Sequence, residues 1–230
     1  MRKAIAIITA RGGSKRIPKK NIKEFCGKPI LAYSIQAALD SKLFDTVMVS
    51  TDSEEIADVA RQYGAEVPFM RSEKTSDDYA TTADVLLEVL LEYEKRGKTF
   101  ENMVCIYPTA PFITAKKLQD VAKCLASDDA VMVLPVVPFS YPPQRGYVIK
   151  DDYLEMKWKE NYTARSQDLE KMYHDAGQFY FYKIDAFKAK NGQITEGISP
   201  IVLDEMEVQD IDNETDWKLA ELKYKLLREC

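Results

Sequence analysis

A basic loop near the start of the chain has the composition of a phosphate-binding site. Residues 10–21 read ARGGSKRIPKKN, and two adjacent glycines, Gly12 and Gly13, let backbone N–H groups come close to an anion. Residues 11–28 contain seven lysines and arginines against one acidic residue, Glu24, so this stretch carries a net charge of +6. A solvated basic loop is the alternative. The position directly after a buried strand, where open α/β sheets bind ligands, favours the phosphate site.

Two aspartates near the other end of the chain have the spacing of a metal site. Asp210 and Asp212 stand two residues apart in the segment VQDID, so along an extended chain their side chains point the same way. One or two carboxylates together with substrate phosphates are the ligands that Mg²⁺ usually takes. A helix cap is the alternative, because Asp212 or Asn213 precedes the helical pattern ETDWKLAELKY. The basic loop earlier in the chain favours the metal.

Two further segments could line a substrate. The segment YPTAPF (107–112) follows a strand-like run, and its prolines and the Thr109 hydroxyl form either a substrate wall or an ordinary strand end. Arg71 and the segment SDDYATT (76–82) could hold a base and a ribose, or could only cap the helix that follows.

Alternating strands and helices must position these loops. The pattern predicts strands at 4–8, 45–50, 65–69, 102–107, 129–135 and 178–183, and helices at 30–39, 54–64, 81–96, 115–126 and 214–227. Such alternation indicates crossover units and a parallel sheet. Residues 138–176 are polar, proline-rich and aromatic, and we expect them to form an arm inserted into a single domain that spans 1–230.

The composition excludes several classes of protein. A net charge of −5 and an isoelectric point near 5.2 argue against nucleic-acid binding. One histidine, His174, rules out a multi-histidine zinc site, and four cysteines without CxxC spacing exclude a zinc ribbon and fit the cytoplasm. The absence of GxxxxGK[ST] and GxGxxG disfavours P-loop enzymes and NAD-dependent oxidoreductases. No apolar run approaches the ~20 residues of a membrane span, so no membrane association is expected.

Taken together, the motifs resemble those of the cytidylyltransferases that activate acidic sugars. The resemblance covers residues 3 to about 228 and is carried by ITARGGSKRIPKKN, STD, YPTAPF and VQDIDNETDW. The runs TTADVL, PPQR and TARSQDLEKMYHDAGQFY are more similar to the branch that acts on pseudaminic acid than to the branch that acts on sialic acid. Tyr107 and the stretch 174–178 depart from the sialic acid pattern where the sugar would lie.

This resemblance implies a fold, an assembly and a reaction. The fold would be a Rossmann-like, three-layer α/β/α domain with a mostly parallel sheet, in a homodimer whose 138–176 arm reaches the partner's active site. With Mg²⁺ as cofactor, the anomeric hydroxyl of a nonulosonic acid, an acidic nine-carbon sugar, would attack the α-phosphorus of CTP and release pyrophosphate. Sialic, legionaminic or 3-deoxy-octulosonic acid is the alternative sugar, and a non-catalytic nucleotide-binding protein is the alternative from another class.

The resemblance also assigns roles to residues. The nucleotide would be held by Arg11, Gly12, Gly13, Ser14, Lys15, Lys20, Asn21, Arg71 and Thr81. Lys20, Arg11 and Asp210 would be catalytic, with Lys20 the most sensitive to mutation, and Asp210 and Asp212 would hold the metal. The candidates for sugar binding are Tyr107, Thr109, Gln144, Arg145, Arg165, Gln167, Asp168, His174, Asp175 and Gln178. Because the sugar carries a carboxylate, a cation must face it, and Arg145 and Arg165 are the candidates.

Overall fold

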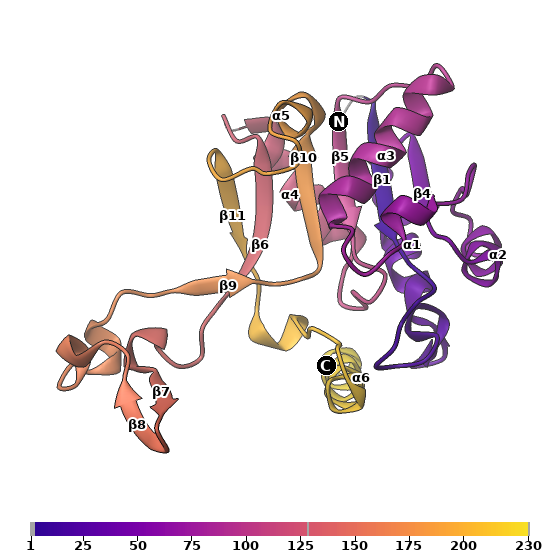
Figure 1. The fold of residues 1–230 in the computed structure, drawn as a ribbon. Coiled ribbons are helices and arrows are strands. Elements are labelled where there is room, and N and C mark those ends of the chain that lie inside the picture. Colours follow the sequence, from indigo (N-terminus) through magenta and orange to yellow (C-terminus); the bar gives the residue numbers. More distant parts are fainter. Residues whose placement is uncertain (1–2, 128, 230) are drawn as a thin grey trace.

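A seven-stranded mixed sheet forms the centre of the computed structural model, which describes residues 3–127 and 129–229 (Figure 1). The strand order is β11-β6-β10-β5-β1-β4, and β9 pairs with β6. In chain order these strands are β1 (Ala4–Thr9), β4 (Thr46–Ser50), β5 (Asn102–Ile106), β6 (Met132–Pro138), β9 (Tyr173–Asp175), β10 (Phe179–Lys183) and β11 (Ile198–Val202).

The parallel core of the sheet is built on β1. Its apolar run is fully buried from Ala4 to Ile8, and β1 pairs in parallel with both β4 and β5. A strand that is covered on both faces needs such a continuous apolar run. β11 also runs parallel to its neighbour β6, whereas β10 is antiparallel to both β5 and β6.

Helices cover both faces of the sheet. On one face Leu31 of α1, Ile56 of α2 and Leu118 of α4 pack in one cluster with Ile8 of β1. On the other face α3 and α5 pack against Ile7 of β1. The bounds of the helices are α1 (Ile30–Ser41), α2 (Glu54–Gln62), α3 (Thr82–Lys95), α4 (Ala115–Ser127), α5 (Ile184–Ala189) and α6 (Glu214–Glu229). The predicted three-layer α/β/α arrangement is confirmed.

The strand predicted at 65–69 does not form. Glu66 alone bridges to β4, with its N–H donating to Val47 O at 2.8 Å and its carbonyl accepting from Val49 N at 3.0 Å. Pro68 follows two residues later and has no N–H to continue a ladder.

The helix α6 lies beyond one end of the sheet (Figure 1). A short hairpin of β2 (Glu24–Phe25) and β3 (Lys28–Pro29) holds it there. The Phe25 ring packs edge-on against Trp217 and Tyr224 of α6, with ring centroids 5.6 and 5.4 Å apart. This aromatic cluster places the start of α6 beside the basic loop, although the two segments lie at opposite ends of the sequence.

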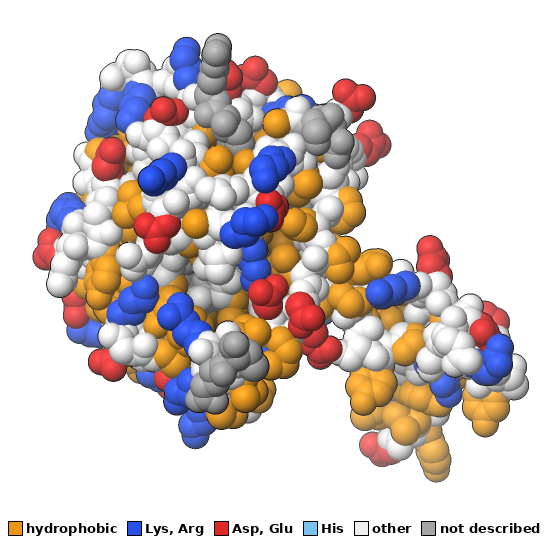
Figure 2. All heavy atoms as spheres, turned by 180° about the vertical axis from the view of Figure 1, so that it is seen from behind, with side chains coloured by type: hydrophobic (Ala, Val, Ile, Leu, Met, Phe, Trp, Pro, Cys, Tyr) orange, Lys and Arg blue, Asp and Glu red, His pale blue; other side chains and the backbone are white. Residues whose placement is uncertain are grey.

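The segment between β6 and β9 projects from the body (Figure 1). It contains the hairpin of β7 (Tyr147–Lys150) and β8 (Tyr153–Met156), whose two-residue turn has positive φ angles at Asp151 and Asp152, as a type I′ turn requires. Hydrophobic side chains gather on this projection (Figure 2), and Ile149 and Leu154 are 78% and 69% exposed. The role of this arm in a dimer stays a prediction.

Among the described residues, no helix combines the length and the apolar character that a membrane crossing requires.

Candidate active site

A cavity of about 570 Å³ opens where β1 and β5 end. Thr9 and the basic loop line one side of it, and Tyr107, Pro108 and Thr109 line another. Of the residues predicted to bind nucleotide or metal, those that line this cavity are Arg11, Ser14, Lys15, Lys20, Asn21, Arg71, Asp210 and Asp212. The structure therefore brings the predicted phosphate loop and the predicted metal ligands to one place.

The basic loop is held in shape by its own polar groups. The Ser14 hydroxyl donates to Ile17 O at 2.7 Å, and the amide of the buried Asn21 donates to Arg11 O at 2.8 Å. The Gly12 N–H donates to the Asp52 carboxylate at 2.7 Å. A Cβ on Gly12 would lie 3.1 Å from Ser53 Cβ, so this close approach favours glycine.

The two predicted phosphate-binding glycines do not line the cavity. The N–H of Gly12 is already committed to Asp52, and Gly13 has no heavy atom within 4 Å of where its Cβ would be. Gly12 therefore serves the packing of the loop against the start of α2, and the lysine and arginine side chains form the cationic wall.

Lys20 joins the basic loop to the aspartate segment. Its Nζ donates to Ile211 O at 2.6 Å and lies 3.8 Å from a carboxylate oxygen of Asp212. The side chain is only 20% exposed, and this burial lowers the pKa of the ammonium while Asp212 and Asp210 oppose that shift. Arg16 donates to Asp212 at 2.8 Å.

The two aspartates differ in their surroundings. Asp212 pairs with Arg16, whereas the pKa of Asp210 is raised by partial burial and by the neighbouring Asp212. Asn213 caps α6, because its Oδ1 accepts from Thr215 N at 2.8 Å. Asn213 therefore caps α6, a role that the sequence also allowed for Asp212. The Asp212 carboxylate instead contacts Arg16 and Lys20.

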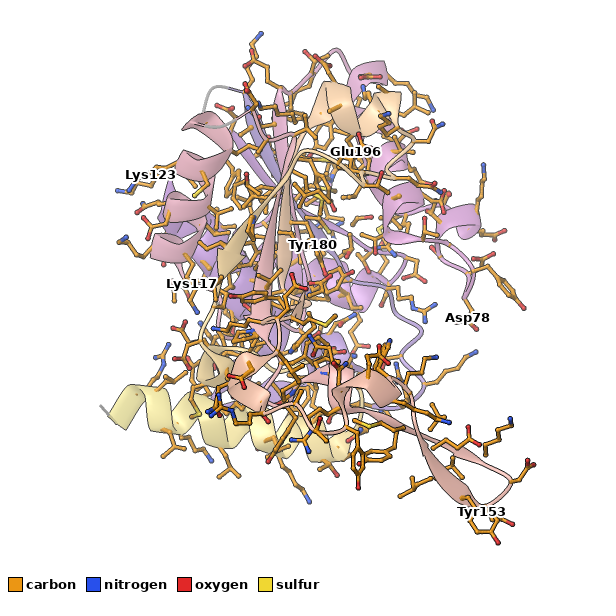
Figure 3. The ribbon with its side chains drawn as sticks, turned by 90° about the vertical axis from the view of Figure 1, so that its left-hand side faces the viewer. Asp78, Lys117, Lys123, Tyr153, Tyr180 and Glu196 are labelled. Carbon is orange, nitrogen blue, oxygen red and sulfur yellow. The ribbon has the colours of Figure 1, made fainter. Side chains whose placement is uncertain are left out.

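One acidic residue that lines the cavity, Asp78, was not singled out by the sequence reasoning. Asp78 accepts from Arg11 at 2.9 Å and from Lys15 at 2.6 Å, and these hydrogen bonds lower the pKa of its carboxyl. Figure 3 shows Asp78 on its loop at the side of the sheet. The sequence offered only a weak signal, two adjacent aspartates in the segment 76–82, which lies far along the chain from the basic loop.

Of the two residues predicted to bind base or ribose, Arg71 lines the first cavity and Thr81 does not. Arg71 is buried, and its guanidinium donates to Ser50 Oγ at 3.1 Å and to Ser50 O at 2.7 Å, so it forms part of the cavity wall. Burial lowers the pKa of this guanidinium. The Thr81 side chain instead forms a capping box with Asp84 at the start of α3 and does not line the cavity, whereas Thr82 does.

A second cavity of about 510 Å³ adjoins the first, and Tyr107 and Asp210 line both. Three predicted sugar-binding residues line it, namely Tyr107, His174 and Asp175. The Asp175 carboxylate is fixed, because it accepts from Gly177 N at 2.7 Å and from the Tyr180 hydroxyl at 2.9 Å. Burial, together with Tyr107 and Asp175, raises the pKa of Tyr180, so this phenol stays protonated and donates. Figure 3 shows Tyr180 within the sheet.

The remaining predicted sugar-binding residues lie elsewhere. Gln178 is 1% exposed, and its amide donates to Glu207 O at 2.6 Å, so it supports the backbone behind the second cavity and does not line it. In the arm, Arg165 pairs with Asp168 at 2.7 Å. The arm residues that were predicted to bind sugar but line neither cavity of their own chain are Gln144, Arg145, Arg165, Gln167 and Asp168. They belong to the segment between β6 and β9, which projects from the body (Figure 1).

Sequence comparison relates the chain to known cytidylyltransferases. The family model described as Cytidylyltransferase matches residues 5–214. Pseudaminic acid cytidylyltransferase of Campylobacter jejuni is 39% identical over 99% of this chain and 98% of its own length. CMP-N,N'-diacetyllegionaminic acid synthase of Legionella pneumophila is 31% identical over 98% of each chain.

A solved structure supports the fold. CMP:2-keto-3-deoxy-manno-octonic acid synthetase, complexed with CTP, superposes with a TM-score of 0.69 at 16% identity and covers 99% of this chain and 100% of its own. From the family match and the full-length similarity to its curated members, the chain belongs to the cytidylyltransferase family.

Proposed function

We propose that this protein transfers the cytidylyl group of CTP to a nonulosonic acid, with pseudaminic acid as the sugar. The anomeric hydroxyl of the sugar attacks the α-phosphorus, the bond to the leaving oxygen breaks, and pyrophosphate departs. The observation that carries the proposal is one cavity lined by Arg11, Lys15 and Lys20 together with Asp210 and Asp212. The similarity to pseudaminic acid cytidylyltransferases over nearly the whole chain supports the choice of sugar.

The cations of the first cavity would neutralise the triphosphate. Phosphoryl-type transfer depends mainly on positioning and on charge stabilisation, and the lysines and arginines of the loop supply both. Lys20 is the best placed of them, because its Nζ is already held at the boundary between the loop and the aspartate segment. Asp78 competes with the phosphates for Arg11 and Lys15 and would give way when CTP binds.

The aspartate segment fits a divalent metal. Asp210 and Asp212 line the same cavity, and the pKa of Asp210 is raised first by burial and then by the negative charge of Asp212, both of which a bound cation would offset. In the part of the chain that the structure describes, no group of three or more metal-binding side chains gathers, so substrate phosphates would supply the further ligands. Bound Mg²⁺ would neutralise phosphate charge and favour ionisation of the attacking hydroxyl.

The second cavity would take the sugar. Because Tyr107 and Asp210 border both cavities, the reacting hydroxyl and the α-phosphorus would meet beside them. Asp175, fixed by two donors, would accept a hydrogen bond from a hydroxyl or an acylamino group. The exposed apolar side chains of the arm would pack in a homodimer, in which the partner's arm could bring Arg145 or Arg165 to this cavity.

A direct assay tests the proposal. Pyrophosphate release from CTP is measured with pseudaminic, legionaminic and sialic acids side by side, and the product is identified by mass spectrometry. We expect a CMP-sugar with pseudaminic acid as the preferred substrate. Preference for another acid would correct the sugar, and absence of release with every acid would overturn the function. Lys20→Ala should be inactive, and Lys19→Ala, whose side chain pairs with Glu55 outside the cavity, is the matched control.

A further inference from the structure

The second cavity contains a lysine that none of the sequence motifs singled out. Lys223 reaches it from α6 and is half-buried. Its Nζ donates to Glu205 O at 3.0 Å and to Val208 O at 2.8 Å, so the ammonium is held in one place. A lysine ammonium has three N–H donors, and these two bonds leave one for a ligand.

The charges around Lys223 make it distinctive. Of the described residues that line the second cavity, Lys223 is the one lysine or arginine. The cavity also contains the carboxylates of Asp175, Glu205 and Asp210. An anionic group that enters this cavity is therefore repelled by these three carboxylates and attracted to the ammonium that α6 contributes.

The chemistry of the substrate requires a cation near the reaction centre. In a nonulosonic acid the carboxylate and the attacking hydroxyl are attached to the same carbon atom. The group that binds the carboxylate must therefore lie close to the boundary between the two cavities. Lys223 donates to the carbonyl of Val208, two residues before Asp210, which lines both cavities.

The other cations are placed less well for this task. Arg11, Lys15, Arg16 and Lys20 line the first cavity, where the triphosphate would bind. Arg165 pairs with Asp168 within the arm and lines neither cavity of its own chain.

We propose that Lys223 binds the carboxylate of the acidic sugar and so orients the anomeric hydroxyl toward the α-phosphorus. This inference rests on the proposed function. The interaction is a charge-assisted hydrogen bond and involves no proton transfer. It makes Lys223 a determinant of specificity for acidic over neutral sugars, because the three carboxylates of the cavity disfavour any other placement of the anion.

A purely structural role for Lys223 predicts something different. Its two backbone bonds help to hold the segment from Glu205 to Val208, so its loss could displace Asp210. The same segment is also held by Gln178, which donates to Glu207 O, and by Lys117, which pairs with the Glu207 carboxylate at 3.1 Å. A test must therefore separate binding of the carboxylate from support of the segment.

The experiment compares two forms of the sugar. The value of kcat/KM is measured for the free acid and for its primary amide, which has the same shape without the charge, using wild-type protein and the Lys223→Met and Lys223→Arg variants. Lys225→Met, at an exposed lysine of the same helix, is the matched control. Thermal melting verifies that each variant folds, and CTP binding is measured separately.

We expect wild-type protein to prefer the acid over the amide by roughly 10- to 100-fold, the range for a hydrogen bond to a charged group. Lys223→Met should lose that factor with the acid, keep its rate with the amide and bind CTP normally, while Lys223→Arg should recover part of the preference. Equal losses with acid and amide would mean a structural role and would overturn the proposal. A Lys223→Met variant that keeps the full preference for the acid over the amide would also overturn the proposal. Loss of that preference in Arg165→Met would then identify the arm as the source of the cation.

Binding measured without turnover separates this inference from the proposed function. Calorimetry with a non-hydrolysable CTP analogue gives the affinity for the acid and the amide. If wild-type protein binds the acid in preference to the amide and Lys223→Met does not, the inference stands even when no pyrophosphate is released. If wild-type protein binds neither form, both proposals fail.

Discussion

Replacing Lys20 by methionine should separate catalysis from folding. Methionine keeps most of the length and the apolar stem of lysine but removes the ammonium that contacts Ile211 O at 2.6 Å and lies 3.8 Å from Asp212. In the proposed reaction that ammonium also stabilises charge on the phosphates. The substitution therefore removes one structural hydrogen bond and one interaction of the transition state.

The two losses differ in size. A hydrogen bond from a charged group contributes about 1.5–3 kcal/mol, and since burial disfavours the charged ammonium and offsets part of that gain, we expect a net loss of stability near the lower end. For a domain of this size, that corresponds to a fall in Tm of roughly 3–6 °C. Loss of one preorganised donor to a transition state costs about 100- to 1,000-fold in kcat.

Continuous detection of pyrophosphate gives kcat, and thermal melting followed by circular dichroism gives Tm. Lys20→Met should be folded at 25 °C and slower by the factor above, whereas the control Lys19→Met should stay within about twofold of wild type, because exposed ion pairs contribute little. If Lys20→Met keeps more than a tenth of the wild-type kcat, the role given to this ammonium is wrong.

Four other perturbations have defined outcomes. Asp210→Asn should raise Tm at pH 7 while lowering kcat at least ~100-fold. Because the pKa of Asp210 is raised, the folded state loses stability as pH rises from the ordinary aspartate range through the raised pKa, and the uncharged amide side chain of the variant removes this penalty. An unchanged or lower Tm would contradict this reasoning. Asp78→Asn should lower the KM for CTP by about two- to fivefold in steady-state kinetics at low salt, and this decrease should be smaller in 0.5 M NaCl. A higher KM would refute the competition between Asp78 and the phosphates for Arg11 and Lys15. Asn213→Ala should lower stability by about 1 kcal/mol in urea titrations, since it removes the cap of α6. Ile149→Asp should convert the proposed homodimer to a monomer in sedimentation velocity, and an unchanged particle size would exclude this face of the arm from the interface.

Local patterns in the sequence predicted the features that depend on local physics. The apolar run of β1, the caps at the starts of α3 and α6 and the cationic loop all follow from residues close together in the chain. The spacing of Asp210 and Asp212 likewise indicated a shared direction, and both line the first cavity.

Features that depend on distant contacts could not be read in the same way. The antiparallel course of β10 is set by its insertion between β5 and β6, and nothing within its own apolar residues encodes a direction. Gln178 was expected to bind sugar, but its amide is used by Glu207 O, 29 residues away. The contact of Asp78 with Arg11 spans 67 residues, so the basic loop alone gave no sign of it.

The aromatic cluster that joins Phe25 to α6 has a consequence for the order of folding. It brings together groups that are far apart in sequence, and the hydrogen bond from Lys20 to Ile211 closes a separation of 191 residues. Contacts of such high sequence separation cost the most chain entropy, and in folding they form late. An intermediate could therefore possess the central sheet and still lack a reaction centre, and recovery of enzyme activity during refolding should lag behind recovery of secondary structure.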